Sequence, residues 1–142
     1  MEKRIVEIET TIAAEPAKVW KALTGPGVTV MPGTKVETDW QVGHGIVFSG
    51  EWKGKAFEDH GEILSADKGK EASFTHWSGA GGRPDNYHIV RYRLAPDGKN
   101  TRVTLTQSNV GPKADVDDKT KAEFTKTFRM MLDGLKQAAE GS

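Results

Sequence analysis

Hydrophobic and polar residues alternate at the start of the chain. Val6, Ile8 and Ile12 share one side of the alternation, and glutamates occupy the other side. A period of two with one charged face is typical of a half-buried strand. The pattern therefore predicts a strand over residues 4–12.

A different periodicity follows this strand. Val19, Trp20 and Leu23 recur at helical spacing after a proline, which is tolerated in the first turn of a helix. We therefore expect a short amphipathic helix over residues 15–23. Residues 26–34 contain prolines and glycines, and we expect them to be irregular or to form a single turn.

The middle of the chain consists of short apolar-rich runs separated by turn sequences. Short strands joined by short turns favour an antiparallel meander. The predicted strands cover residues 36–40, 46–52, 57–64, 72–78, 87–94 and 101–108.

Helical periodicity returns near the end of the chain. Asp115 is a suitable helix cap, and Asp117 and Asp118 would place negative charge at the positive end of the helix. One apolar face recurs at steps of three and four residues. It consists of Phe124, Phe128, Met131, Leu132 and Leu135. The complete pattern predicts an α+β fold, with one domain over residues 1–142: a curved antiparallel sheet grips a long C-terminal helix.

Charge and composition remove several classes of function. Lysine plus arginine equals aspartate plus glutamate, at 20 each, whereas a nucleic-acid binder usually has a basic excess. The absence of cysteine excludes disulfides and thiolate metal sites. The sequence shows neither a signal peptide nor an apolar stretch as long as a membrane span. We therefore expect a cytoplasmic protein with no nucleic-acid partner and no membrane span.

Large aromatic residues suggest a cavity between the sheet and the helix. A curved sheet diverges from a straight helix toward the helix ends, and rigid rings would fill that wedge incompletely. The expected apolar lining is Trp40, Phe48, Phe74, Tyr92, Phe124, Phe128 and Met131. The expected polar groups are His76, His88 and Gln107. We predict these as ligand-binding residues, and we predict no catalytic residue.

Three histidines form a candidate row across neighbouring strands. If the turns centre on Lys68 and Gly82, His60 would lie opposite His76, and His76 opposite His88. Such a row could line a cavity or form a metal or acid/base site. The alternative, which we favour, is that the three are unrelated, because one bulge moves a side chain to the other face. The outer strands would lie about 10 Å apart, so we expect neither a metal nor another cofactor.

Four stretches of the chain resemble a known superfamily. They are residues 12–24 with Pro-x-x-Val-Trp-x-x-Leu-Thr, residues 39–43 with Trp-x-Val-Gly, the hairpin within residues 61–77, and residues 100–108. They resemble the START-like superfamily (SRPBCC, helix-grip fold), in the branch of homologues of the activator of the heat-shock ATPase. The resemblance implies the fold. Functions in this superfamily range from lipid carriers and hormone receptors to polyketide cyclases, oxygenase domains and co-chaperones.

Three functions are therefore compared. The first is binding of a small hydrophobic or amphipathic molecule in the cavity. The second is a cyclase or hydrolase activity that uses a cavity histidine, which we rank lower because the carboxylates fall at positions expected to be solvated. The third is a co-chaperone-like interaction module in the stress response, with a chaperone as partner, for which the balanced charge gives no support.

Overall fold

The computed structural model describes residues 2–25, 34–79 and 82–141, apart from the side chain of Trp52. The expectation for residues 26–34 therefore falls almost entirely outside the described residues. The elements in chain order are β1 (Glu2–Ile12), α1 (Pro16–Thr24), β2 (Thr34–Glu37), β3 (Gly45–Trp52), β4 (Lys55–Asp67), β5 (Glu71–Ser78), β6 (Tyr87–Asp97), β7 (Asn100–Val110) and α2 (Asp118–Glu140).

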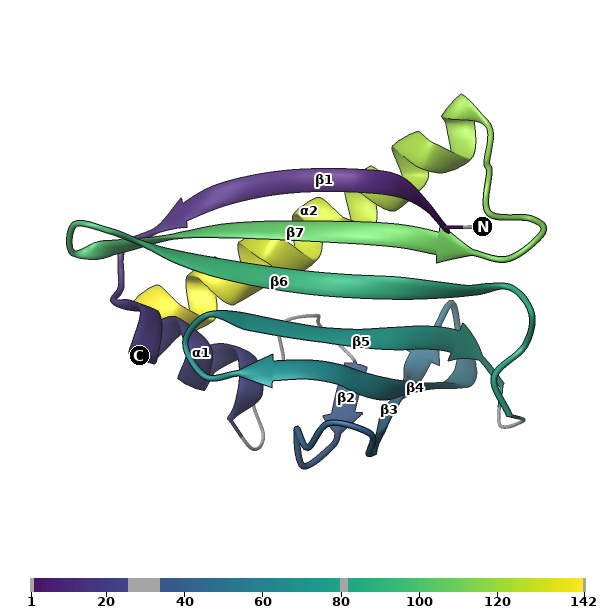
Figure 1. Cartoon of the computed structure of the whole chain (residues 1–142), viewed down its shortest axis with the longest axis horizontal. Helices are drawn as coiled ribbons and strands as arrows, with labels where there is room; N and C mark the ends of the chain where they lie inside the picture. Colours follow the sequence, from purple (N-terminus) through teal and green to yellow (C-terminus); the bar gives the residue numbers. More distant parts are fainter. Residues whose placement is uncertain (1, 26–33, 80–81, 142) are drawn as a thin grey trace.

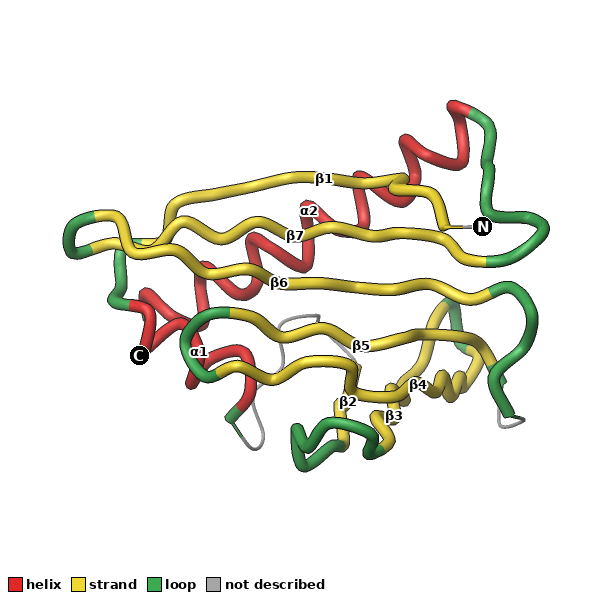
Figure 2. The backbone as a smooth tube through the Cα atoms, in the orientation of Figure 1, coloured by secondary structure: helices red, strands yellow, loops and turns green. Residues whose placement is uncertain are grey.

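All the strands belong to one antiparallel sheet with the order β1-β7-β6-β5-β4-β3-β2. The long strands β1, β7 and β6 lie side by side, and β2 and β3 run steeply to them at the other edge (Figure 1). Helix α2 crosses one face of this curved sheet diagonally, and its C-terminal end lies beside α1 (Figure 2). The predicted α+β architecture is confirmed.

Two of the predicted boundaries are wrong. Strand β2 ends at Glu37, so Trp40 lies outside the strand, in the loop before β3. Helix α2 is capped by Asp117, whose carboxylate accepts a 2.8 Å hydrogen bond from the backbone N–H of Thr120. Asp115 lies outside the helix and forms an ion pair with Lys3.

The concave face of the sheet and the apolar face of α2 form the core. Ile12, Val103 and Leu105 of the sheet are fully buried, and so are Leu132 and Leu135 of α2. The predicted apolar face of the helix is confirmed, because these side chains leave water together with those of the sheet. Each such buried side chain stabilises the fold by about 1.5–3 kcal/mol before entropic costs.

Strand β4 contains an irregularity that decides which side chains reach the concave face. Its pairing with β5 shifts register between Ile63 and Ser65. Nearby, the backbone N–H of Glu62 donates a 2.9 Å hydrogen bond to the Thr75 hydroxyl. A Cβ atom at Gly61 would overlap the backbone carbonyl of Thr75, so the close approach of the two strands requires glycine.

Candidate functional site: a cavity between the sheet and the C-terminal helix

A cavity of about 420 Å³ lies between the sheet and α2. The structure brings together around it every residue that the sequence analysis proposed for the site. These residues are Trp40, Phe48, Phe74, His76, His88, Tyr92, Gln107, Phe124, Phe128 and Met131. That they bind a ligand stays a prediction.

Aromatic rings in mutual contact form one wall of the cavity. The Phe74 ring lies 6.2 Å from the ring of Trp40 and 5.3 Å from that of Phe48, measured between centroids. The Phe48 ring in turn meets the His76 imidazole edge to face at 5.3 Å. Because each ring packs against its neighbour, the wall is rigid, and the rings cannot collapse into the cavity without losing these contacts.

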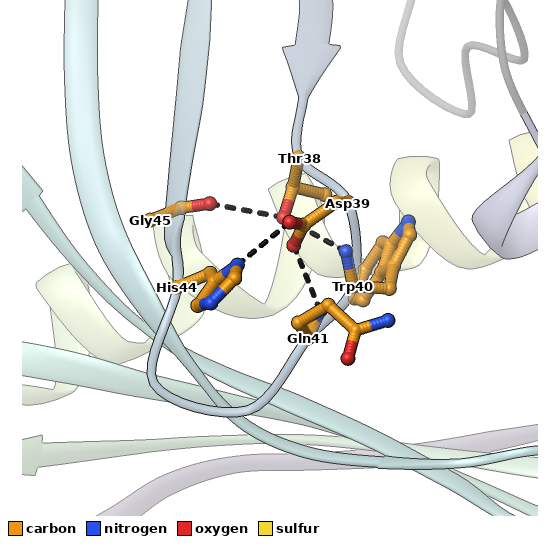
Figure 3. Close-up of polar contacts among 6 residues, drawn as sticks. All are labelled: Thr38, Asp39, Trp40, Gln41, His44 and Gly45. Atoms are coloured by element: carbon orange, nitrogen blue, oxygen red, sulfur yellow. Dashed lines mark hydrogen bonds and ion pairs between the residues drawn. The ribbon is translucent and has the colours of Figure 1, made fainter.

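The loop between β2 and β3 positions Trp40. This residue has a φ of 56°, a left-handed conformation that is uncommon for a bulky side chain. Thr38 stabilises it, because its hydroxyl accepts from the Trp40 backbone N–H at 3.2 Å and donates to the Gly45 carbonyl at 2.9 Å (Figure 3). The loop thereby turns back on itself and directs the indole toward the cavity.

A second interaction closes the same loop on its exposed side. The Asp39 carboxylate lies 2.6 Å from His44 Nδ1 and accepts a 2.9 Å hydrogen bond from the Gln41 backbone N–H (Figure 3). The hydrogen bond to His44 is the main cause that lowers the pKa of Asp39. His44 itself is exposed.

Asp59 and His76 form a partly buried pair in the cavity wall. The Asp59 carboxylate Oδ2 lies 3.0 Å from His76 Nε2. Burial lowers the pKa of His76; Asp59 raises it, and His88 lowers it further. The expectation that the strand carboxylates are solvated is therefore wrong for Asp59, whose side chain is only 20% exposed. A base with an orienting carboxylate is present after all.

His88 anchors a second polar group beside this pair. Its ring stacks on that of His76 with centroids 5.9 Å apart and meets the Phe124 ring edge to face at 5.6 Å. His88 Nδ1 lies 2.7 Å from Asn109 Oδ1, which also accepts a 2.9 Å hydrogen bond from Gln107 Nε2. The sheet therefore contributes these two histidines, Asp59 and Gln107 to the cavity lining.

His60 does not join the other histidines. His76 does pair with His88 across β5 and β6, as the candidate row requires, although we favoured the alternative of unrelated histidines. His60 pairs with Trp77 in place of His76. The turn between β4 and β5 centres on Gly69, not on Lys68, and the bulge in β4 then shifts the register by one residue, which reverses the face. His60 Nε2 instead contacts the Glu58 carboxylate at 2.9 Å, and neither residue lines the cavity.

Several lining residues were not proposed from the sequence. They are Leu23, Thr24, Gly25, Thr34, Val36, Thr38, Ile46, Phe57, Asp59, Val90 and Thr127. One signal could have revealed Asp59. The two-residue turn at Lys53 and Gly54 pairs Trp52 with Lys55, and the same register places Asp59 opposite Phe48, on one face of the hairpin.

The lining favours binding by burial, with few polar groups to orient a ligand. Burial raises the pKa of Tyr92, so its hydroxyl stays protonated.

Across residues 2–25, 34–79 and 82–141, no three His, Asp or Glu side chains gather closely enough to hold a metal ion. The helices of this part of the chain are too short or too polar to cross a membrane.

Comparison with solved structures gives the fold a wider context. The solution structure of ChR145 from Cytophaga hutchinsonii is 36% identical, has a TM-score of 0.75, and covers 99% of this chain and 94% of its own. The crystal structure of Ara h 8.0201 has a TM-score of 0.79 at 15% identity and full coverage of both chains. Protein MLL2253 from Mesorhizobium loti has a TM-score of 0.72 at 24% identity, covering 96% of this chain and 97% of its own. The latter two share the fold.

Comparison of the sequence with known families agrees with this structural similarity. No curated protein matches the sequence significantly. Residues 13–140 match the family described as "Activator of Hsp90 ATPase homolog 1-like protein", and this match spans nearly the whole chain. The chain therefore belongs to this family, within the START-like (SRPBCC) superfamily.

Proposed function

We propose that this protein binds a small hydrophobic or amphipathic molecule in the cavity between the sheet and α2. The observation that carries the proposal is the cavity itself, with about 420 Å³ of space enclosed by aromatic and aliphatic side chains. Ligand sites of small molecules are typically concave, largely apolar and provided with a few polar groups. Transfer of apolar ligand surface from water into such a space is favourable by about 25 cal/mol per Å² before entropic costs.

The distribution of polar groups supports an amphipathic ligand. Helix α2 contributes chiefly Phe124, Phe128 and Met131 to the lining, whereas β4 to β7 contribute the Asp59–His76 pair and the group around His88. A ligand with one polar end would direct that end toward the sheet. Met131 has a flexible side chain, so this part of the wall can adapt to the shape of the ligand.

Native mass spectrometry of protein purified from its own cell tests the proposal directly. A retained small molecule is expected, with an apolar body that fits the cavity volume. A complementary titration uses N-phenyl-1-naphthylamine, an uncharged fluorescent probe of apolar sites. We expect saturable binding of one probe per chain.

Two neighbouring methionines offer a matched pair of variants. Met131→Trp would fill the cavity and should reduce probe affinity at least tenfold, while the fold stays intact. Met130 is 50% exposed on α2 and does not line the cavity, so Met130→Trp should leave probe affinity unchanged. Equal probe binding by both variants would show that the probe binds elsewhere and would contradict the proposal.

The Asp59–His76 pair favours one second candidate function, a hydrolase or cyclase that uses His76 as a general base. The pair lies in the cavity wall with the imidazole held by a carboxylate, which is the arrangement of an oriented base. Hydrolysis of 4-nitrophenyl hexanoate tests it. If this function is correct, the wild-type protein shows saturation kinetics, His76→Gln abolishes the activity, and the control variant Glu58→Gln keeps it. A hydrolysis rate equal to that of free imidazole would reject this function.

No comparable observation favours an interaction module. The exposed large hydrophobic side chains of the described residues are Val42, Leu64 and Met130, and each comes from a different part of the chain. Single exposed hydrophobic residues are ordinary on a protein surface and do not indicate a docking patch.

A further inference from the structure

We infer that the cavity recognises a ligand whose polar end donates hydrogen bonds and carries no negative charge, such as an alcohol, a phenol or an amine. This inference rests on the proposed function and adds the chemical class of the ligand's polar end. It follows from three features of the lining: the proton position on His76, the proton position on His88, and the formal charges around the cavity.

The proton of neutral His76 can be assigned to Nε2. The Asp59 carboxylate is an acceptor, so the 3.0 Å contact requires an N–H on His76 Nε2. Burial lowers the pKa of His76, which favours the neutral ring with a single proton. Nδ1 then carries a lone pair and can accept a hydrogen bond from a ligand.

The proton of His88 is assigned by its neighbours. The amide nitrogen of Asn109 donates to the Ala114 carbonyl at 3.2 Å, and a carbonyl accepts only. The amide orientation is therefore fixed, and Asn109 Oδ1 faces His88 Nδ1 at 2.7 Å. Gln107 Nε2 donates to the same oxygen, which confirms its role as acceptor. Gln107 Nε2 also lies 3.2 Å from His88 Nδ1, but this contact is longer, and the amide already donates to Asn109 Oδ1 at 2.9 Å. His88 therefore donates from Nδ1 to Asn109 Oδ1, and in its neutral form the lone pair lies on Nε2.

The two imidazoles thus present acceptors side by side. Their rings stack with centroids 5.9 Å apart, and both line the cavity. A ligand that places a donor beside either ring would give its lone pair a hydrogen-bond partner. The hydroxyls of Tyr92 and the lining threonines can donate or accept, so they adapt to either kind of ligand.

Formal charge argues in the same direction. Among the described residues that line the cavity, Asp59 is the one carboxylate, and no lysine or arginine is present. A ligand carboxylate would lose its hydration without gaining a cationic partner and would approach a second negative charge. A protonated amine would instead gain an attractive interaction with Asp59.

Three ligands with the same tail separate these alternatives. Decylamine, decanol and decanoate, kept below micelle-forming concentrations at pH 7.5, are titrated against the wild-type protein by displacement of N-phenyl-1-naphthylamine. We expect decylamine and decanol to bind at least tenfold more tightly than decanoate. Decanoate binding as tightly as either of them would overturn the inference. If decylamine binds more tightly than decanol, the preference over decanoate is due to charge. If decylamine and decanol bind equally, the preference is due to the imidazole acceptors.

A matched pair of variants assigns the effect to Asp59. Asp59→Asn keeps the shape and the acceptor for His76 but removes the charge, so the affinity ratio of decylamine to decanoate should fall at least fivefold. Glu58→Gln removes the neighbouring carboxylate, which pairs with His60 away from the cavity, and should leave the ratio unchanged. An unchanged ratio in Asp59→Asn would overturn the assignment. If Met131→Trp weakened the binding of none of the three ligands, the proposed function itself would be refuted.

Discussion

The two halves of α2 carry the same apolar periodicity but have different surroundings. In the C-terminal half, Leu132, Leu135 and Ala139 are fully buried, and the helix packs on β1 and α1. In the N-terminal half, Phe124 is only partly buried and, together with Thr127, borders the cavity. The division falls after Met131: the helix from Leu132 onward closes the core, whereas Phe124, Phe128 and Met131 line the cavity.

The difference lies in what faces the helix. The C-terminal half packs on β1 and α1, which contribute aliphatic side chains such as Ile12 and Val19 to the core. The N-terminal half faces rings that pack against one another, including Phe48 and Phe74, and rigid rings fill a widening gap incompletely. Periodicity therefore shows which face of a helix turns inward, but the opposing side chains decide whether that face meets a core or a cavity.

The largest expected effect tests the closed half. Leu132→Ala should lower the free energy of unfolding by about 2–5 kcal/mol, because the deleted side chain leaves a void among tightly packed neighbours. Chemical denaturation measures this loss. Binding of N-phenyl-1-naphthylamine, measured on the folded variant, should change little. A loss below about 1 kcal/mol would mean that this half is as open as the other.

A smaller effect is expected in the open half. Phe124→Ala should cost about 1 kcal/mol or less, because the ring is already partly exposed beside existing space. The same variant should enlarge the cavity and admit a bulkier probe. If Phe124→Ala destabilised the fold as strongly as Leu132→Ala, the contrast between the two halves would be refuted.

The smallest effect concerns pH and the polar wall. Burial lowers the pKa of His76 in the folded protein, so the unfolded chain binds the proton more readily. Stability should therefore be constant above the ordinary histidine pKa, about 6.5, and should fall as the pH drops below it toward the lowered value. His76→Gln should reduce this slope between pH 7.5 and 5.5, measured by chemical denaturation at each pH. A slope equal to that of the wild-type protein would remove His76 from this role.

Much of the fold could be predicted from local patterns. The order of strands and helices follows from periods of two and of three to four residues, and each such signal depends on nearby residues alone. The pairing of His76 with His88 also followed, because the hairpin of β5 and β6 contains no bulge between its paired residues. The aromatic lining could be predicted for a similar reason, because Phe48 and Phe74 lie on the apolar faces of their strands.

The errors occurred where a distant contact overrides the local signal. Asp115 and Asp117 are equally suitable helix caps by residue type. In the structure, Asp117 caps α2, and Asp115 instead forms an ion pair with Lys3 on β1. Trp40 was expected in a strand, but its left-handed backbone is fixed by Thr38, which in turn bonds to Gly45 across the loop.

The sequence by itself therefore determined the elements, their order and the inward face of α2, because these depend on periodicity and turn chemistry. The tertiary structure alone decided the chemistry of the cavity. The bulge in β4 turns His60 away from His76, and the register of β4 with β5 beyond that bulge pairs Asp59 with Ser78, so that the Asp59 carboxylate lies 3.0 Å from His76. A one-residue shift in a strand reverses every side chain beyond it, and periodicity alone does not locate such a shift.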